Sequence, residues 1–132
     1  MSPGRPIPHA VLVVTHGGAG AELAALAKEL LGPTPDLVSI SVTSRDSLET
    51  LAAKMEKWAG HTHAETRRIV LTDLKNSSAT VAALALAKKY PLDCLCGVNL
   101  PLLLKAISQS DVALSDILSA GRAGIDIVCK SK

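Results

Sequence analysis

Aromatic residues are nearly missing from this chain of 132 residues, which has one Trp, one Tyr and no Phe. Proteins that bind single-stranded nucleic acid stack the bases on aromatic side chains, so this composition argues against that function. The charges argue the same way, because 14 basic and 12 acidic residues are dispersed without a basic block. With 48% hydrophobic residues, the chain is expected to fold around an aliphatic core and to bind no nucleic acid.

Long apolar runs are also missing. No stretch approaches the roughly 20 residues that span a bilayer, so we expect no insertion into the membrane. Residues 1–8 contain Pro and Gly but no apolar segment of the kind found in signal peptides. These features favour a cytoplasmic protein with a flexible arm at residues 1–8 and a single domain at residues 9–132.

Cysteine is scarce, with three residues at Cys94, Cys96 and Cys129. An odd number of cysteines without a signal peptide indicates a reducing compartment. Cys94 and Cys96 alternate on an expected strand, so we interpret both as buried structural residues on one face. No further ligands of suitable spacing accompany them, and the sequence predicts neither a metal site nor a cofactor.

Strand-like and helix-like segments alternate along the chain. This alternation predicts an α/β fold with a doubly wound, mainly parallel sheet and helices on both of its faces. Expected strands cover residues 11–16, 37–42, 68–72, 93–98 and 125–129. Expected helices cover residues 21–31, 46–60, 78–90, a segment opening at residues 99–101, and residues 111–120, with a turn at Gly121 and Gly124.

Three helix starts have recognisable caps. Asp46 with Glu49 has the spacing of a capping box, and Ser78 is expected to cap the helix that follows it. Asn99 precedes Pro101, a favourable order for a cap followed by the first helical turn. These caps define where the loops at one end of the sheet give way to helices.

Residues 11–20 read Val-Leu-Val-Val-Thr-His-Gly-Gly-Ala-Gly and form the most informative stretch. An aliphatic strand ends on His16, and Gly17 and Gly18 then turn the chain into a helix. Backbone N–H groups at such a helix start can hold an anion, and glycine lets them approach it closely. His16 is therefore placed beside a predicted phosphate-binding turn.

Other polar residues are expected at the same rim, because ligands of parallel α/β sheets bind beyond the carboxyl ends of the strands. Besides His16, these ends hold Thr43, Asp73 and Asn99. A carboxylate that binds one imidazole nitrogen fixes the tautomer and leaves the other nitrogen as a nucleophile. His16 and Asp73 suit this arrangement; alternatively, the histidine caps its turn and the aspartate binds loop amides.

The remaining candidates have simpler interpretations. His9 is given no role, and the polar loop that contains His61 and His63 is expected at the solvated surface. Arg67 and Arg68 stand at a strand entrance and are interpreted as solvated, while residues 102–104, three leucines, belong to the core.

Three segments in order make the chain resemble the mannose-family enzyme IIA domain of the bacterial phosphoenolpyruvate:sugar phosphotransferase system. They are residues 14–17 (Val-Thr-His-Gly), residues 71–74 (Leu-Thr-Asp-Leu) with Ser78 following, and residues 97–102 (Gly-Val-Asn-Leu-Pro-Leu). Residues 120–125 also look like the family's last turn from helix to strand. The resemblance covers about residues 9–128.

The resemblance implies a phosphoryl carrier. His16 would accept a phosphoryl group from the phosphocarrier protein HPr and pass it to a IIB component. Asp73 would orient the imidazole, and Ser78 would contact the phosphoryl group from its helix start. The family further implies a homodimer that exchanges the strand expected at residues 125–129.

One segment departs from the family pattern. After the Asp-containing strand the family usually has an aromatic or large residue and then Gly-Gly-Ser-Pro, whereas this chain has Lys75-Asn76-Ser77-Ser78-Ala79. Asparagine tolerates the left-handed backbone region, so Asn76 is expected to preserve the turn. Lys75, Asn76, Ser77 and Asn99 are the residues expected to face partners, and the altered loop puts transfer to a IIB component in doubt.

Three other functions stay open. A regulatory interaction protein could keep the phosphorylatable fold without sugar transport. A small tetrapyrrole metal chelatase also has a first strand ending in His-Gly, but it needs a second histidine, for which only His61 and His63 are available. A response-regulator receiver is less consistent, because the first strand lacks an acidic pair for magnesium.

Overall fold

The computed structural model describes residues 8–33 and 36–132. Four strands form one parallel sheet in the order β2-β1-β3-β4, as the alternating sequence pattern predicts. The strands are β1 (His9–His16), β2 (Leu37–Val42), β3 (Arg67–Thr72) and β4 (Asp93–Leu95). The helices are α1 (Ala19–Leu31), α2 (Leu48–His61), α3 (Ser78–Leu86), α4 (Leu100–Ser108) and α5 (Leu114–Ala123). The expected N-terminal arm, apart from Pro8, lies outside the described residues.

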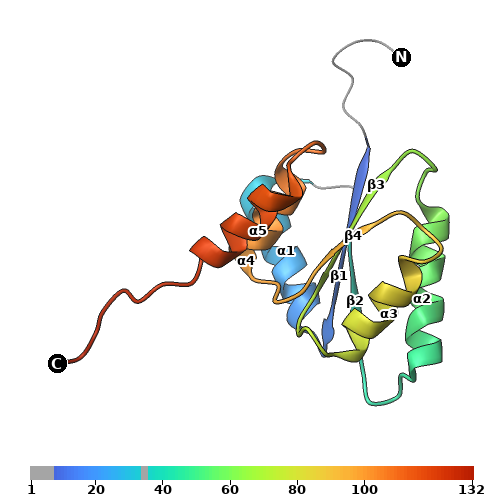
Figure 1. The fold of residues 1–132 in the computed structure, drawn as a ribbon, viewed down its shortest axis with the longest axis horizontal. Coiled ribbons are helices and arrows are strands. Elements are labelled where there is room, and N and C mark those ends of the chain that lie inside the picture. Colours follow the sequence, from blue (N-terminus) through green and yellow to red (C-terminus); the bar gives the residue numbers. More distant parts are fainter. Residues whose placement is uncertain (1–7, 34–35) are drawn as a thin grey trace, which may run out of the picture.

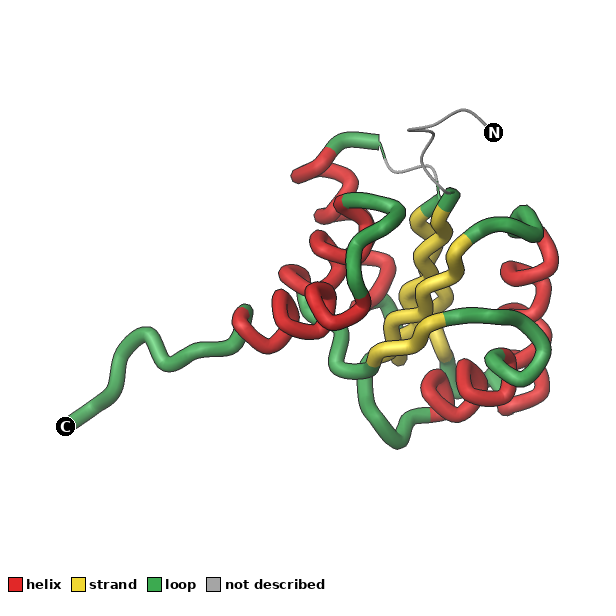
Figure 2. The backbone as a smooth tube through the Cα atoms, turned by 45° about the horizontal axis from the view of Figure 1, so that its top comes forward, coloured by secondary structure: helices red, strands yellow, loops and turns green. Residues whose placement is uncertain are grey.

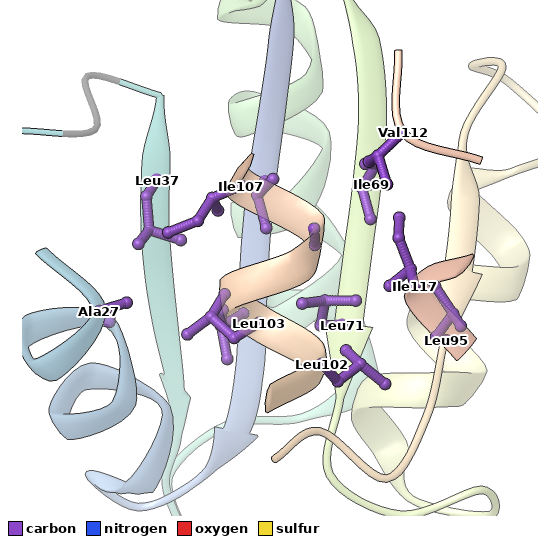
Figure 3. Close-up of a cluster of buried hydrophobic side chains, with 14 residues drawn as sticks. Ala27, Leu37, Ile69, Leu71, Leu95, Leu102, Leu103, Ile107, Val112 and Ile117 are labelled. Atoms are coloured by element: carbon purple, nitrogen blue, oxygen red, sulfur yellow. The ribbon is translucent and has the colours of Figure 1, made fainter. Parts of the chain in front are cut away.

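The central strand β1 separates two aliphatic clusters. Val11 and Val13 point to the face that α1, α4 and α5 cover, whereas Leu12 and Val14 point to the face covered by α2 and α3 (Figure 1). Successive strand residues point to opposite faces, so burial on both sides requires the unbroken aliphatic run of β1. Figure 3 shows the first cluster, in which Leu103 of α4 lies among Leu37, Leu71 and Ile107. Leu102 and Leu103 are buried, as expected for core residues.

Two predicted helix caps are wrong by one residue. Ser47, not Asp46, caps α2, and its hydroxyl accepts the N–H of Thr50. The Asp46 carboxylate instead accepts the N–H of Thr43 at 2.9 Å and binds Lys54 Nζ at 2.9 Å. Ser77, not Ser78, caps α3, and this helix ends at Leu86 rather than at residue 90.

The chain after residue 95 also differs from the prediction. Strand β4 has three residues because Gly97 and Val98 turn to donate their N–H groups to the carbonyls of Asp73 and Thr72, both at 2.9 Å. Residues 97–98 are therefore a connection and not part of a strand. Gly121 lies inside α5, where a Cβ atom would come within 2.7 Å of Leu102, so this glycine permits close helix packing instead of ending a helix.

Residues 125–129 form no strand with the described sheet, contrary to the expectation for a single chain. They follow α5 away from the body of the protein (Figures 1 and 2). Ile125 and Ile127 are exposed, and Val128 is 97% exposed. The structure describes one chain, and exchange of this segment in a dimer stays a prediction.

Two further interpretations need correction. Arg68 is buried, because its guanidinium donates to Thr62 Oγ1 at 2.7 Å and stacks 5.1 Å from the centre of the Tyr90 ring. Only Cys94 is partly buried, and burial raises the pKa of its thiol to about 11, whereas Cys96 and Cys129 are exposed. Among the described residues, no helix is long and apolar enough to cross a membrane.

Candidate active site

The candidate site is built at the carboxyl ends of two neighbouring strands. His16 is the last residue of β1, and Asp73 directly follows β3. From β1 the chain leads to β2 on one side and later returns to β3 on the other, so the connections diverge at this point. Such a switch point is where parallel α/β sheets bind ligands.

Asp73 binds His16 through both its backbone and its side chain. Asp73 Oδ2 accepts the backbone N–H of His16 at 2.9 Å and lies 2.8 Å from Nδ1 of the imidazole. Asp73 Oδ1 accepts the N–H of Leu74 at 2.8 Å. Partial burial alone would raise the pKa of Asp73, but the hydrogen bonds from His16 and Leu74 hold it well below its usual value. The carboxyl group is therefore ionised.

An ionised carboxylate at Nδ1 requires a proton on that nitrogen, which leaves the lone pair of neutral imidazole on Nε2. The His16 side chain is 57% exposed, whereas that of Asp73 is 20% exposed. The acceptor is thus held within the protein and the ring remains open to a reactant. This geometry gives His16 a fixed tautomer and an accessible nucleophilic nitrogen.

The glycine turn after His16 presents the start of α1. Gly17 has a φ of +60°, which favours glycine, and donates its N–H to the Val42 carbonyl at 2.9 Å. Gly18 occupies the cap position without a side chain, and within the described residues the N–H groups of Gly18 and Ala19 have no protein partner. These donors suit an anion at the positive end of the helix dipole.

Gly20 keeps α1 close to β1. Its N–H donates to the buried Thr15 hydroxyl at 2.7 Å, and an added Cβ would lie 2.9 Å from the same oxygen. The third glycine is therefore required by packing, whereas Gly17 is required by backbone conformation.

A buried group of hydroxyls supports the loop after Asp73. We call Thr72, Ser77 and Thr80 the hydroxyl cluster. Thr80 Oγ1 lies 2.6 Å from Thr72 Oγ1 and donates to the Leu74 carbonyl at 2.6 Å, and Ser77 Oγ donates to the same carbonyl at 2.9 Å. Since the Leu74 N–H binds Asp73, the hydroxyl cluster fixes the residue that orients the carboxylate. Sequence reasoning missed Thr72 and Thr80; the Ser77-x-x-Thr80 spacing, typical of a capped helix start, was the available signal.

The other predicted site residues lie around this centre. Ser78 is half-buried in the first turn of α3, and Lys75 and Asn76 are exposed in the loop between Asp73 and α3. Asn76 does not take a left-handed conformation, since the positive φ values in the described chain belong to Gly17, Gly32 and Gly97. That prediction is wrong, because the Ser77 cap lets an ordinary backbone path enter α3.

Asn99 has a structural role in this chain. Its side chain accepts the N–H of Leu102 at 3.0 Å, capping α4 as predicted, and donates to the Gly121 carbonyl of α5 at 2.9 Å. Both ends of the amide are occupied within the protein.

His61 and His63 are not near the site. His61 is the last residue of α2 and His63 lies in the connection from α2 to the start of β3, whereas His16 lies at the opposite, carboxyl end of the sheet. A second histidine across the cleft, which the chelatase hypothesis requires, is not provided by these residues. In the described part of the chain, no group of three His, Cys, Asp or Glu residues is arranged to hold a metal ion.

Comparison with known proteins identifies the family. A family model described as "PTS system fructose IIA component" matches residues 10–120. The chain belongs to this IIA family. The match includes His16, Asp73, the loop between Asp73 and α3, and most of α5.

Solved structures agree with this fold. The PTS IIA protein associated with the fucose utilization operon of Streptococcus pneumoniae is 22% identical, with a TM-score of 0.84 over 93% of this chain and 95% of that one. The mannose/sorbose-specific IIA subunit of Enterococcus faecalis is 20% identical, with a TM-score of 0.83 over 96% and 98%. A sigma-54 interaction domain protein from Enterococcus faecalis is 18% identical, with a TM-score of 0.73 over 91% and 92%. None of the curated protein sequences matches the chain.

Proposed function

We propose that the protein is a phosphoryl carrier of the phosphotransferase system, with His16 as the phosphorylated residue. The supporting observation is the contact of 2.8 Å between Asp73 Oδ2 and His16 Nδ1, which leaves Nε2 as the nucleophile. The Nε2 lone pair forms a bond to phosphorus while the bond from phosphorus to the donor breaks, and its electron pair leaves with the donor. In the second transfer, a nucleophile of the acceptor forms the bond to phosphorus. The bond between phosphorus and Nε2 then breaks, and its electron pair returns to the imidazole.

The groups around His16 suit a transferred phosphoryl group. The uncapped N–H groups at Gly18 and Ala19 can donate to its oxygens, and Gly17 permits the turn that presents them. Ser78 begins α3 and supplies a further hydroxyl on the Asp73 side. Asp73 stabilises the positive charge that the imidazole gains when Nε2 forms the new bond.

The family suggests the partners. HPr is the proposed donor and a IIB component the proposed acceptor, which places the reaction in the cytoplasm. We also propose that two copies exchange residues 125–129, because these apolar residues are exposed and the outer edge of β4 has no neighbouring strand in the described sheet.

The carrier role is tested by phosphorylation. Incubation with labelled phosphoenolpyruvate, enzyme I and HPr is expected to yield an acid-labile phosphohistidine on the protein. His16→Gln should abolish labelling, whereas His63→Gln, an exposed histidine at the other end of the sheet, should label normally. Equal labelling of wild type and His16→Gln would contradict the proposal.

A regulatory role is the second candidate, and the loop at residues 75–79 favours it. Lys75 places a mobile charge where the family usually has a bulky residue, which alters a partner surface more than the chemistry of His16. Under this hypothesis phosphorylation is retained while transfer to a mannose-type IIB component is slow.

The two roles are separated by a transfer assay. The phosphorylated wild type is compared with a Lys75→Trp, Asn76→Gly variant, in which Ser77 is kept because its hydroxyl caps α3. Faster transfer by the variant supports the regulatory role. Equal and rapid transfer by both proteins shows that the loop is a tolerated variation of a transport component.

A further inference from the structure

A concave surface lies far from His16 on the α2 side of the sheet. A hollow of about 570 Å³ opens between the outer strand β2 and the C-terminal half of α2, and we call it the β2–α2 hollow. Its lining includes Ala10 and Thr66, at the starts of β1 and β3, whereas His16 ends β1. Its volume is in the range of small-molecule sites in proteins.

The walls of the β2–α2 hollow are mainly apolar. Trp58, the chain's single tryptophan, contributes from α2, and Val38 and Ile40 contribute from β2. Val38 is 42% exposed, and Trp58 and Ile40 are only partly buried. The flat indole and the branched aliphatic side chains give the hollow an apolar wall that suits a planar apolar ligand.

Two lysines of α2, Lys54 and Lys57, border this apolar surface. Lys54, Lys57, Trp58 and His61 follow a spacing of three, four and seven residues, so α2 presents them on one face. Lys54 is engaged by Asp46, but Lys57 has no ion pair within the described residues. His61 Nδ1 donates to the Lys57 carbonyl at 2.8 Å, so the neutral ring has only the Nε2 lone pair left and offers no donor to an anion. Among the described residues that line the hollow, Asp36 is the one acidic residue and Lys57 is the one lysine without an ion pair.

Thr66 provides a polar group without a partner. It is 9% exposed and lines the β2–α2 hollow, and its backbone N–H binds the His63 carbonyl. Within the part of the chain that the structure describes, its hydroxyl makes no hydrogen bond. Because Thr66 lines the hollow, this hydroxyl can donate a hydrogen bond to a ligand that enters it.

We propose that the β2–α2 hollow binds a small planar aromatic carboxylate. The ring lies between Trp58 and the side chains of Val38 and Ile40. The carboxylate lies toward Lys57, and Thr66 donates a hydrogen bond to it. This site is separate from the phosphorylation chemistry, and its occupancy does not require His16.

The single tryptophan makes the test specific. In ¹H–¹⁵N spectra the Trp58 indole N–H gives one resonance, which is followed while trans-cinnamate is added to the full chain. Cinnamyl alcohol serves as the neutral ligand of the same shape, and inorganic phosphate as an anion without a ring. We expect a saturable shift with cinnamate, affinity at least about ten-fold weaker for the alcohol, and no saturable shift with phosphate.

Three variants test which residues bind the cinnamate carboxylate. Lys57→Gln and Thr66→Val should each weaken cinnamate binding several-fold, whereas Lys28→Gln, on α1 at the opposite face of the sheet, should bind as wild type does. The midpoint of thermal unfolding and the dispersion of the ¹H–¹⁵N spectrum without ligand show whether each variant is folded. His16→Gln should bind cinnamate normally, which separates this test from that of the carrier function.

Three outcomes would overturn the proposal. The first is the absence of a saturable Trp58 shift at millimolar cinnamate. The second is equal affinity for cinnamate and cinnamyl alcohol, which would indicate only an apolar surface. The third is unchanged binding in folded Lys57→Gln and Thr66→Val proteins.

Discussion

Asp73 Oδ2 lies 2.9 Å from the backbone nitrogen of His16 and 2.8 Å from Nδ1 of the same residue. One carboxylate oxygen therefore fixes both the position of the strand end and the tautomer of its side chain. The two residues are separated by 57 positions in sequence and meet because β1 and β3 are adjacent parallel strands.

The first prediction concerns Asp73→Asn, which removes the charge but keeps the shape. A hydrogen bond to a charged group contributes about 1.5–3 kcal/mol, so phosphorylation of His16 should slow by about 10- to 100-fold. The rate is measured with phosphorylated HPr in a rapid-quench assay. Asp46→Asn is the matched control, because Asp46 also accepts a backbone N–H bond, from Thr43, in a neighbouring loop but does not contact His16. Unchanged kinetics in Asp73→Asn would remove this residue from the mechanism.

The lowered pKa of Asp73 predicts a dependence of stability on pH. Its folded-state pKa lies below the unfolded value of about 3.9, so its contribution is complete above that value and is lost as pH falls through the folded pKa. The difference in free energy of unfolding between wild type and Asp73→Asn should therefore be smaller at pH 3 than at pH 5. Urea denaturation at both pH values measures it, and an equal or larger difference at pH 3 would contradict the assignment.

The hydroxyl cluster predicts that Thr80 affects both stability and phosphorylation. Thr80→Val removes the partner of the buried Thr72 hydroxyl and should cost about 1–3 kcal/mol of unfolding free energy. The looser Leu74 backbone should also change the chemical shift of His16 Nδ1 and slow phosphorylation several-fold. Thr80→Ser should restore both properties.

Thr50 offers the matched control for this experiment. It occupies the same position after the cap of α2 as Thr80 does in α3, but it is exposed and does not contact the Asp73 loop. Thr50→Val should leave the His16 spectrum and the rate unchanged. If Thr80→Val is destabilised but phosphorylated at the wild-type rate, the hydroxyl cluster has only a structural role.

Variants of two glycines distinguish the cost of backbone strain from a role in binding the phosphoryl group. Gly17 and Gly32 both have positive φ, and an added Cβ would contact nothing within 4 Å at either position. Gly17→Ala should cost about 1–2 kcal/mol, roughly the penalty for the left-handed region, and Gly32→Ala should cost at least as much, because its φ of 84° and ψ of −169° lie in a region nearly confined to glycine. Only Gly17→Ala should also slow phosphorylation, because Gly32 ends α1 at the far end from His16. Equal phosphorylation rates in the two variants would exclude Gly17 from phosphate binding.

The sequence alone predicts the parallel sheet and the meeting of His16 with Asp73, because these follow from buried runs and from the polar residues that end them. The cap of α3 could not be chosen in this way, since Ser77 and Ser78 are adjacent hydroxyl residues and the path of the Asp73 loop decides between them.

Contacts between distant segments explain the other differences. Strand β4 is short because residues 97–98 bind the backbone of Thr72 and Asp73, and no local pattern reveals that pairing. Arg68 is buried because Thr62, Tyr90 and Pro91 surround its guanidinium with partners, although its sequence position indicates a solvated charge.

The last prediction concerns the exposed segment at residues 125–132. Ile125, Ile127 and Cys129 would share one face if this segment were extended, and β4 offers an outer edge without a neighbouring strand in the described sheet. If the segment of one copy pairs with the β4 edge of a second copy, its apolar side chains and that strand edge are both removed from water. Light scattering should therefore give a dimer for the full chain and a monomer after deletion of residues 125–132. Ile127→Asp should weaken the dimer strongly, whereas Asp126→Asn, on the other face, should have little effect. A full-length protein that is monomeric at micromolar concentration would contradict exchange of this segment.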